Sequence, residues 1–186
     1  MKSILSILAG FLISLPLMAQ TQTASNAAAA ADVPGINWIS IEEAWARNSV
    51  TPKKIFIDVY TNWCGWCKRM DETTFRDPKI VDYINRHYYA VKMNAESKDP
   101  VTLSGQRYVN PNPEGRRSPH ELAALLLQGQ MSYPSYVFLN EKAEKLKVVK
   151  GYLQTGAMEP WLHFFGSDAY LSQGWEQYQA SFVSPK

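Results

Sequence analysis

Cysteine is scarce in this sequence, with two residues, Cys64 and Cys67, in a chain of 186. Exported proteins that rely on a disulfide framework carry many more. The chain also has 6 Trp, 10 Tyr and 7 Phe, which is ample for an ordinary hydrophobic core. We therefore expect the two cysteines to have a chemical role and not to serve as a disulfide framework.

Histidine is almost as scarce, and this bears on metal binding. His87, His120 and His163 are scattered singly, and no second cysteine pair accompanies the first. A structural zinc site needs four Cys or His ligands in paired spacings, so we expect no metal site. Zinc binding by an isolated pair and a purely structural disulfide are the alternatives. A disulfide across so short a loop would restrict little chain entropy.

An excess of charge of either sign is missing as well. The 19 Lys and Arg residues and 17 Asp and Glu residues give a formal net charge of +2, without a basic run. Nucleic-acid binding and attachment to an anionic membrane surface both depend on clustered positive charge. We therefore expect a partner that is neither a nucleic acid nor a lipid surface.

Long hydrophobic runs are also absent. The apolar stretch Ile4–Leu15 is shorter than the roughly 20 residues of a membrane-spanning helix. With the basic residue before it and a small residue at a plausible cleavage point, Met1–Ala19 has the pattern of a secretory signal peptide; an uncleaved anchor is the alternative. Residues 20–35, with five consecutive alanines, are typical of a low-complexity spacer. Residues 36–186 have the length of one domain.

What is present is a Cys-x-x-Cys between two regular elements. Ile55–Tyr60 is an apolar run typical of a buried strand, and Lys68–Glu72 has a helical pattern. A cysteine at a helix N-terminus lies beside unpaired N–H groups and the positive end of the helix dipole. Both favour the thiolate and lower the pKa of the thiol. The thiolate attacks disulfides, so the motif predicts dithiol–disulfide exchange.

Periodicity and capping signals predict the remaining elements. We expect strands at Lys54–Tyr60, Tyr88–Asn94, Tyr136–Asn140 and Leu146–Lys150. We expect helices at Ile41–Arg47, Cys64–Phe75, Pro78–Arg86, Val101–Tyr108, Leu122–Gln128, Gly156–Phe165 and residues 168–178. A parallel βαβ unit followed by an antiparallel hairpin predicts an α/β fold with a mixed central sheet and helices on both faces.

Two of these helices depend on capping signals. Asp99-Pro100 has the form of an N-cap followed by proline at the first helical position, ahead of Val101–Tyr108. Ser118-Pro119-His120-Glu121 has the form of a capping box, ahead of Leu122–Gln128.

The stretch Ile57–Lys68, which contains Trp-Cys-Gly-Trp-Cys-Lys, resembles the active-site segment of the thioredoxin superfamily. With the residues that follow it, the WCGWCK form is closer to secreted thioredoxin-like proteins of the DUF255/thioredoxin-7 type. The similarity covers about Trp38–Phe165. It implies a thioredoxin fold, in which residues 111–130 are an insertion before a cis-proline loop and residues 166–186 are a C-terminal helical extension.

The resemblance also implies catalytic roles. Cys64 is expected to be the nucleophile, more exposed than its partner, and Cys67 the residue that resolves the mixed disulfide. Asp58 is expected to take or give the proton at Cys67. Burial in an apolar strand should raise the pKa of this carboxyl, an exposed or capping carboxylate being the alternative. Lys92 falls on the neighbouring strand where the family has a lysine near the acid; a solvent-exposed role is the alternative.

Four further residues are implied to form the substrate surface. Trp63 and Trp66 would flank the dithiol, while Tyr133 and Pro134 would present a groove for the substrate. In the family the proline is cis and faces the cysteines. From the sequence alone, an ordinary trans proline at the start of a strand is favoured, because cis bonds are rare.

We therefore expect an exported, periplasmic oxidoreductase that reduces protein disulfides without a cofactor. Its partners would be protein thiol or disulfide substrates and an upstream dithiol electron donor. A disulfide isomerase or oxidase is an alternative, because direction depends on thiolate stability and not on fold. Alternatives of other classes are a Cu(I)-binding module, with Met70 as the one Met or His close to the thiolates, and a protein-recognition domain without turnover.

Overall fold

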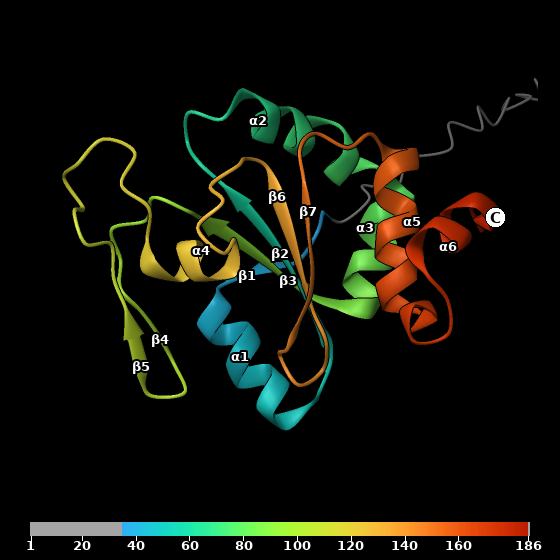
Figure 1. The fold of residues 1–186 in the computed structure, drawn as a ribbon, viewed down its shortest axis with the longest axis horizontal. Helices are drawn as coiled ribbons and strands as arrows, with labels where there is room; N and C mark the ends of the chain where they lie inside the picture. Colours follow the sequence, from blue (N-terminus) through green and yellow to red (C-terminus); the bar gives the residue numbers. More distant parts are fainter. Residues whose placement is uncertain (1–34, 186) are drawn as a thin grey trace, which may run out of the picture. The chain divides into compact units, whose positions relative to one another are not determined.

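A five-stranded mixed sheet forms the centre of the computed structural model, which describes residues 35–185 (Figure 1). The strand order is β1-β3-β2-β6-β7; β1 and β2 run parallel to β3, whereas β6 is antiparallel to β2 and β7 to β6. The strands are β1 (Trp38–Ile39), β2 (Lys54–Tyr60), β3 (Tyr88–Asn94), β6 (Ser135–Leu139) and β7 (Lys145–Lys150). The predicted mixed α/β sheet is confirmed.

Helices cover both faces of this sheet. On one face lie α1 (Ile41–Val50) and α4 (Glu121–Leu126). The other face carries α2 (Gly65–Glu72), α3 (Pro78–His87) and α5 (Thr155–Gly166). Within these residues, no helix combines the length and hydrophobicity needed to cross a bilayer. The expected signal peptide and all of the expected spacer but Gly35 lie outside the described residues.

Alternation along β2 decides which side chains meet which helices. Ile55, Ile57 and Val59 belong to the apolar cluster beneath α1 and α4. Phe56 belongs to the opposite cluster, with residues of α2, α3 and α5. Because successive side chains of a strand point to opposite faces, Asp58 lies on the Phe56 side, beneath α2. The β2 strand therefore sends one carboxyl into the layer that carries the cysteines.

The C-terminal extension packs on α5 (Figure 1). It consists of a 3-10 turn, η2 (Ala169–Leu171), and α6 (Trp175–Ser181), in place of the one helix expected over 168–178. The indole of Trp175 stacks on that of Trp161, with ring centroids 3.2 Å apart. The predicted helical extension is confirmed, although it is divided in two.

The helix expected over Cys64–Phe75 is likewise divided, into α2 and a 3-10 turn, η1 (Thr74–Arg76).

The helix expected at Val101–Tyr108 is wrong. The segment is a hairpin of β4 (Val101–Leu103) and β5 (Gln106–Tyr108). The turn residues Ser104 and Gly105 have φ of 49° and 82°. Positive φ at both central residues is the two-residue turn that matches the twist of paired strands. Ser-Gly in the middle of the segment thus outweighs the Asp-Pro signal before it.

The capping box expected before α4 is also wrong. His120 is the N-cap, and its Nδ1 accepts from the backbone N–H of Leu122. Ser118 donates instead to the side chain of Asn110, and Glu121 accepts from the N–H of Val109. Both polar side chains are engaged by the preceding loop, so the imidazole caps the helix.

Candidate active site

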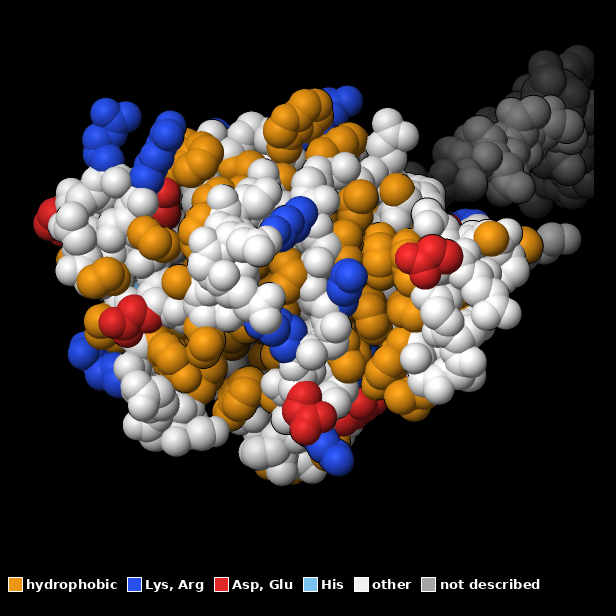
Figure 2. Space-filling model, viewed as in Figure 1, with side chains coloured by type: hydrophobic (Ala, Val, Ile, Leu, Met, Phe, Trp, Pro, Cys, Tyr) orange, Lys and Arg blue, Asp and Glu red, His pale blue; other side chains and the backbone are white. Residues whose placement is uncertain are grey.

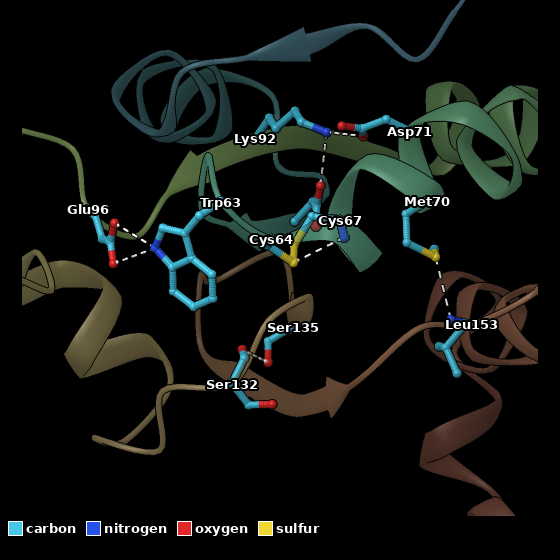
Figure 3. Close-up of a disulfide and its surroundings, with 11 residues drawn as sticks. Trp63, Cys64, Cys67, Met70, Asp71, Lys92, Glu96, Ser132, Ser135 and Leu153 are labelled. Carbon is cyan, nitrogen blue, oxygen red and sulfur yellow. Dashed lines mark hydrogen bonds and ion pairs between the residues drawn. A yellow bond between two sulfur atoms is a disulfide. The ribbon is translucent and has the colours of Figure 1, made fainter. Parts of the chain in front are cut away.

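Cys64 and Cys67 form a disulfide at the start of α2 (Figure 3). β2 ends at Tyr60, and a turn in which the N–H of Cys64 donates to the carbonyl of Thr61 leads into the helix. Cys64 is the N-cap, and its Sγ accepts from the N–H of Cys67 at 3.1 Å. An N–H donor and the positive end of a helix therefore act on the sulfur of Cys64.

The two sulfurs are not distinguished by exposure. Cys64 is 5% exposed and Cys67 3% exposed, so the expected greater accessibility of Cys64 amounts to little. What distinguishes them is position, because Cys64 caps the helix and Cys67 lies within its first turn. The assignment of Cys64 as nucleophile therefore depends on the helix end.

Aromatic side chains flank the disulfide on both sides. Trp63 and Trp66 are both more than half exposed. The Trp63 ring meets the edge of Tyr133 at 5.8 Å, and the Trp66 ring lies 5.1 Å from that of Tyr152. Trp63 Nε1 donates to both carboxylate oxygens of Glu96 at 3.0 Å (Figure 3). The structure thus brings Trp63, Trp66 and Tyr133 together around the cysteines, as the resemblance implies.

Pro134 lies at the same end of the sheet. The Tyr133–Pro134 peptide bond is cis, and Pro134 directly precedes β6. Ser135 pairs with Val59, two residues before Thr61, so this loop reaches the end of β2 that leads to Cys64. Figure 3 shows Ser132 and Ser135, which bracket the Tyr-Pro pair, across from the disulfide. Residues about seventy positions apart in the sequence therefore form one site.

Asp58 is buried on the face of β2 that α2 covers. It is 1% exposed, and its Oδ1 has no hydrogen-bond partner within residues 35–185. Burial raises the pKa of this carboxyl from its ordinary value to about 6; Lys92 opposes that rise and Asp71 adds to it. The carboxyl therefore changes charge near neutral pH.

Lys92 joins Asp58 to α2. Its Nζ contacts Asp58 Oδ2 at 3.1 Å and also pairs with Asp71, and Figure 3 shows the end of Lys92 pointing at Asp71. Burial alone would lower the pKa of Lys92, but the two carboxylates outweigh it and the pKa is raised. Its ammonium also lies 5.1 to 5.7 Å from the rings of Trp38, Tyr60 and Phe75. Lys92 is therefore a charged member of the site, not an exposed strand residue.

Asp71 and Tyr136 are site residues that the sequence analysis missed. Asp71 follows Cys67 by four residues on α2, a spacing that places both on one helix face and could have revealed it. Tyr136 faces Asp58 across the β2–β6 pair, and burial, then Asp58, raises the pKa of its phenol. Nothing in the sequence near Tyr136 indicates that pairing, which depends on strand register.

Metal ligands do not gather around the disulfide. In the part of the chain that the structure describes, no group of three or more His, Cys, Asp and Glu side chains could hold a metal ion. Met70 is fully buried, and its sulfur accepts from the N–H of Leu153 at 3.4 Å. The residue that would have supplied a third soft ligand is thus engaged elsewhere.

The family model described as a thioredoxin-like domain matches residues 41–166. The chain belongs to this family. The matched residues include the cysteine pair, Asp58, Lys92 and the cis-proline. The mixed α/β sheet of this chain is the fold expected of a thioredoxin-like domain. The finer assignment to the DUF255/thioredoxin-7 type stays a prediction.

Solved structures show the same fold. A thioredoxin-fold protein from Helicobacter pylori aligns with a TM-score of 0.55 and 15% identity, covering 75% of this chain and 96% of that one. A thioredoxin from Thermus thermophilus gives 0.52 and 16%, covering 70% and 86%. A protein from Bacteroides thetaiotaomicron assigned as a disulphide isomerase gives 0.52 and 27%, covering 77% and 100%.

A similarity to one curated protein is confined to a short segment. The chain is 36% identical to the thiol:disulfide interchange protein DsbD of Photorhabdus laumondii over 44 residues. That segment is 24% of this chain and 7% of the relative. This chain's thioredoxin-like fold and Cys-x-x-Cys pair support thiol–disulfide oxidoreductase activity in general terms.

Proposed function

We propose that this thioredoxin-like protein is an exported oxidoreductase that reduces disulfides of other proteins through Cys64 and Cys67. The observation that carries the proposal is the cysteine pair at the N-terminus of α2, backed by a buried carboxyl whose pKa is about 6. The first gives an acidic thiol, and the second a proton acceptor at neutral pH.

The first step belongs to Cys64. In the reduced protein its thiolate attacks one sulfur of the substrate disulfide, which forms a mixed disulfide and releases the other substrate sulfur as a thiolate that takes up a proton. The helix N-terminus stabilises the attacking thiolate. Exposed Trp63 and Trp66 provide apolar surface for the substrate polypeptide.

The second step belongs to Cys67 and Asp58. Cys67 passes its proton to the Asp58 carboxylate and attacks Cys64 Sγ, so the second substrate sulfur leaves as a thiolate. The product is the Cys64–Cys67 disulfide, the form present in the structure. Two electrons have moved to the substrate, and no cofactor takes part. An upstream dithiol donor restores the reduced pair by the reverse exchange.

The charges behind Cys67 favour the reducing direction. Once Asp58 is ionised, above about pH 6, Lys92 contacts two acidic side chains, those of Asp58 and Asp71, and the group has one ammonium for two acids. Negative charge disfavours a thiolate relative to a disulfide, so the reduced pair gives up its electrons more readily. Stabilisation of the reduced form has the opposite effect and makes a strong oxidant.

Reduction of insulin by dithiothreitol, with and without the protein, tests the proposal. We expect catalysis by the wild type and none by Cys64→Ser, while Lys142→Ser, a change at an exposed residue of the turn between β6 and β7, leaves the rate unchanged. A wild type that does not accelerate reduction would contradict the function. Such a result would favour a metal-binding or protein-recognition role for the pair.

Disulfide isomerisation is the second candidate. It is favoured by the 27% identity to the Bacteroides thetaiotaomicron protein, which this chain covers completely. Recovery of activity from a scrambled disulfide substrate in a glutathione buffer separates the two functions. An isomerase restores native pairing faster than dithiothreitol alone, whereas a simple reductase yields reduced substrate.

A further inference from the structure

We propose that Arg117 is a specificity residue that binds a carboxylate of the substrate polypeptide beside its disulfide. The inference rests on the proposed function and names the class of substrate, namely proteins with an acidic residue next to the reactive cysteine. It depends on the contacts of Trp63, the residue directly before Cys64.

Trp63 is held from two sides. Glu96 accepts the indole N–H with both carboxylate oxygens at 3.0 Å. The Arg117 guanidinium lies over the ring, 4.7 Å from its centroid. A guanidinium on an indole face is attracted by the ring's electrons and keeps its N–H groups at the periphery. Arg117 therefore contacts the residue that directly precedes the nucleophile Cys64 in the sequence.

A buried brace fixes the loop that carries Arg117. The Asn110 side chain donates to the carbonyls of Ser97 and Ser118 and accepts from the Ser118 hydroxyl. His120 is fully buried, and its backbone N–H donates to the carbonyl of Ala95. The loop around Arg117 is therefore tied to residues 95–97, the segment that presents Glu96. Glu96 and Arg117, the two residues that contact the Trp63 indole, therefore lie on segments that are hydrogen-bonded to each other.

The Arg117 side chain has donors to spare. Within residues 35–185 its guanidinium takes part in no ion pair, although Lys98 in the same region pairs with Glu114. The residue is exposed and has a φ of 55°, a left-handed backbone that glycine adopts at lower cost. Within the described residues the arginine at this position therefore contacts an aromatic ring but no carboxylate, and its backbone would accept glycine.

Carboxylate is the ligand that such a group fits. A guanidinium offers parallel N–H donors that match the two oxygens of a carboxylate. Trp63 directly precedes Cys64 and is half exposed, so a polypeptide whose cysteine meets Cys64 can reach the Arg117 guanidinium over the Trp63 ring. A side-chain carboxylate a residue or two from the substrate cysteine can therefore pair with Arg117.

Two peptide disulfides that differ only by Glu or Gln next to the cysteine provide the test. The reduced full-length protein is mixed with each, and the second-order rate of exchange is measured. We expect the wild type to prefer the Glu peptide by about three- to five-fold, as an exposed ion pair allows, and the preference to shrink in 0.5 M salt. Arg117→Glu should reverse the preference, which is read as the ratio of the Glu and Gln peptide rates measured with the same protein.

Two further variants sharpen the test. Arg116→Glu changes the same charge at the adjacent exposed residue, which does not lie over the Trp63 ring; it should keep the preference for Glu. Arg117→Gly removes the side chain and suits the backbone, so it should lose the preference without loss of stability.

The outcomes are distinct. Equal rates for the two peptides in the wild type, or an equal effect of Arg116→Glu and Arg117→Glu, would overturn the assignment of Arg117 while leaving the oxidoreductase function intact. Failure of the wild type to exchange with either peptide would overturn the function and this inference together.

Discussion

Asp58 shows how one residue acquires its chemistry from its neighbours. Its position in an apolar strand predicts burial and a raised pKa, and the structure has both. Lys92 on the adjacent strand and Asp71 on α2 then set the charge around it. The burial of Asp58 and its raised pKa can be predicted from the local sequence, because strand alternation is local. Its contacts with Lys92 and the placement of Asp71 cannot, because they depend on which elements pack together.

Replacement of Asp58 by asparagine should change stability with a definite sign. The folded-state pKa of about 6 exceeds the ordinary 3.8, so the folded protein holds this proton more tightly than the unfolded chain. The resulting stability is full below about pH 4 and is lost as pH rises through 6. Asp58→Asn should therefore match the wild type at pH 4 and exceed it at pH 8 by up to about 3 kcal/mol.

Urea unfolding at pH 4, 6 and 8 measures this difference. Asp82→Asn removes a carboxylate from an exposed pair with Arg86 and should show no comparable gain at pH 8. A wild type more stable than Asp58→Asn at pH 8 would show that the carboxylate is satisfied by its partners.

The same substitution should slow resolution of the mixed disulfide. Asp58 can accept the Cys67 proton only when it is ionised, so the wild-type rate of this step should fall as pH drops through about 6. Asp58→Asn should be slower at pH 7 by on the order of ten-fold or more and should lack that inflection. Stopped-flow decay of a preformed mixed disulfide measures both. Identical pH profiles for the two proteins would remove Asp58 from the reaction.

The roles of the two sulfurs give a second test at this scale. Cys67→Ser should accumulate partner proteins as mixed disulfides on Cys64, because no thiol remains to release them. Cys64→Ser should accumulate few, because Cys67 lies within the helix and not at its end. Non-reducing electrophoresis after acid quenching detects the adducts. Equal accumulation on both variants would contradict the assignment, which the nearly equal exposures of the cysteines leave open.

At the scale of elements, the sequence predicts what is local and fails where a distant contact decides. Lys54–Tyr60 and Tyr88–Asn94 form strands with the expected bounds, because their apolar patterns are continuous. The Asp-Pro signal predicts a helix over Val101–Tyr108, but the Ser-Gly turn and the pairing of β4 with β5 make the segment a hairpin. The sequence places Arg117 within the expected insertion at residues 111–130, but its contact with Trp63 depends on how the loop folds.

Packing of α5 against α3 can be tested with two glycines of the same helix. A Cβ at Gly166 would lie 2.7 Å from the Tyr83 ring, which is stacked between His87 and His163 at 4.1 and 3.7 Å and has little room to move. Gly166→Ala should therefore destabilise by about 1–3 kcal/mol. Gly156→Ala meets nothing within 4 Å and should be neutral or stabilising by up to about 1 kcal/mol. Thermal unfolding compares them; equal effects would contradict this packing.

In the molecule as a whole, the candidate site residues lie toward one end of the central sheet. Strand β2 leads to Cys64, β3 supplies Lys92, and the loop before β6 brings Pro134 to the same end. Figure 2 shows basic and acidic side chains scattered over the viewed face, with no region of a single sign. The formal net charge of the chain is only +2, so we expect selectivity for substrates to come from local groups such as Arg117.

The reduction potential of the Cys64–Cys67 pair tests the central claim most directly. The folded, full-length protein is equilibrated in dithiothreitol and glutathione buffers of known potential, and the free thiols are alkylated and counted. We predict one two-electron transition on the reducing side, near the thioredoxin value of about −270 mV. A potential near the −120 mV or so of a strong protein oxidant, or a pair that never exchanges with the buffer, would contradict it.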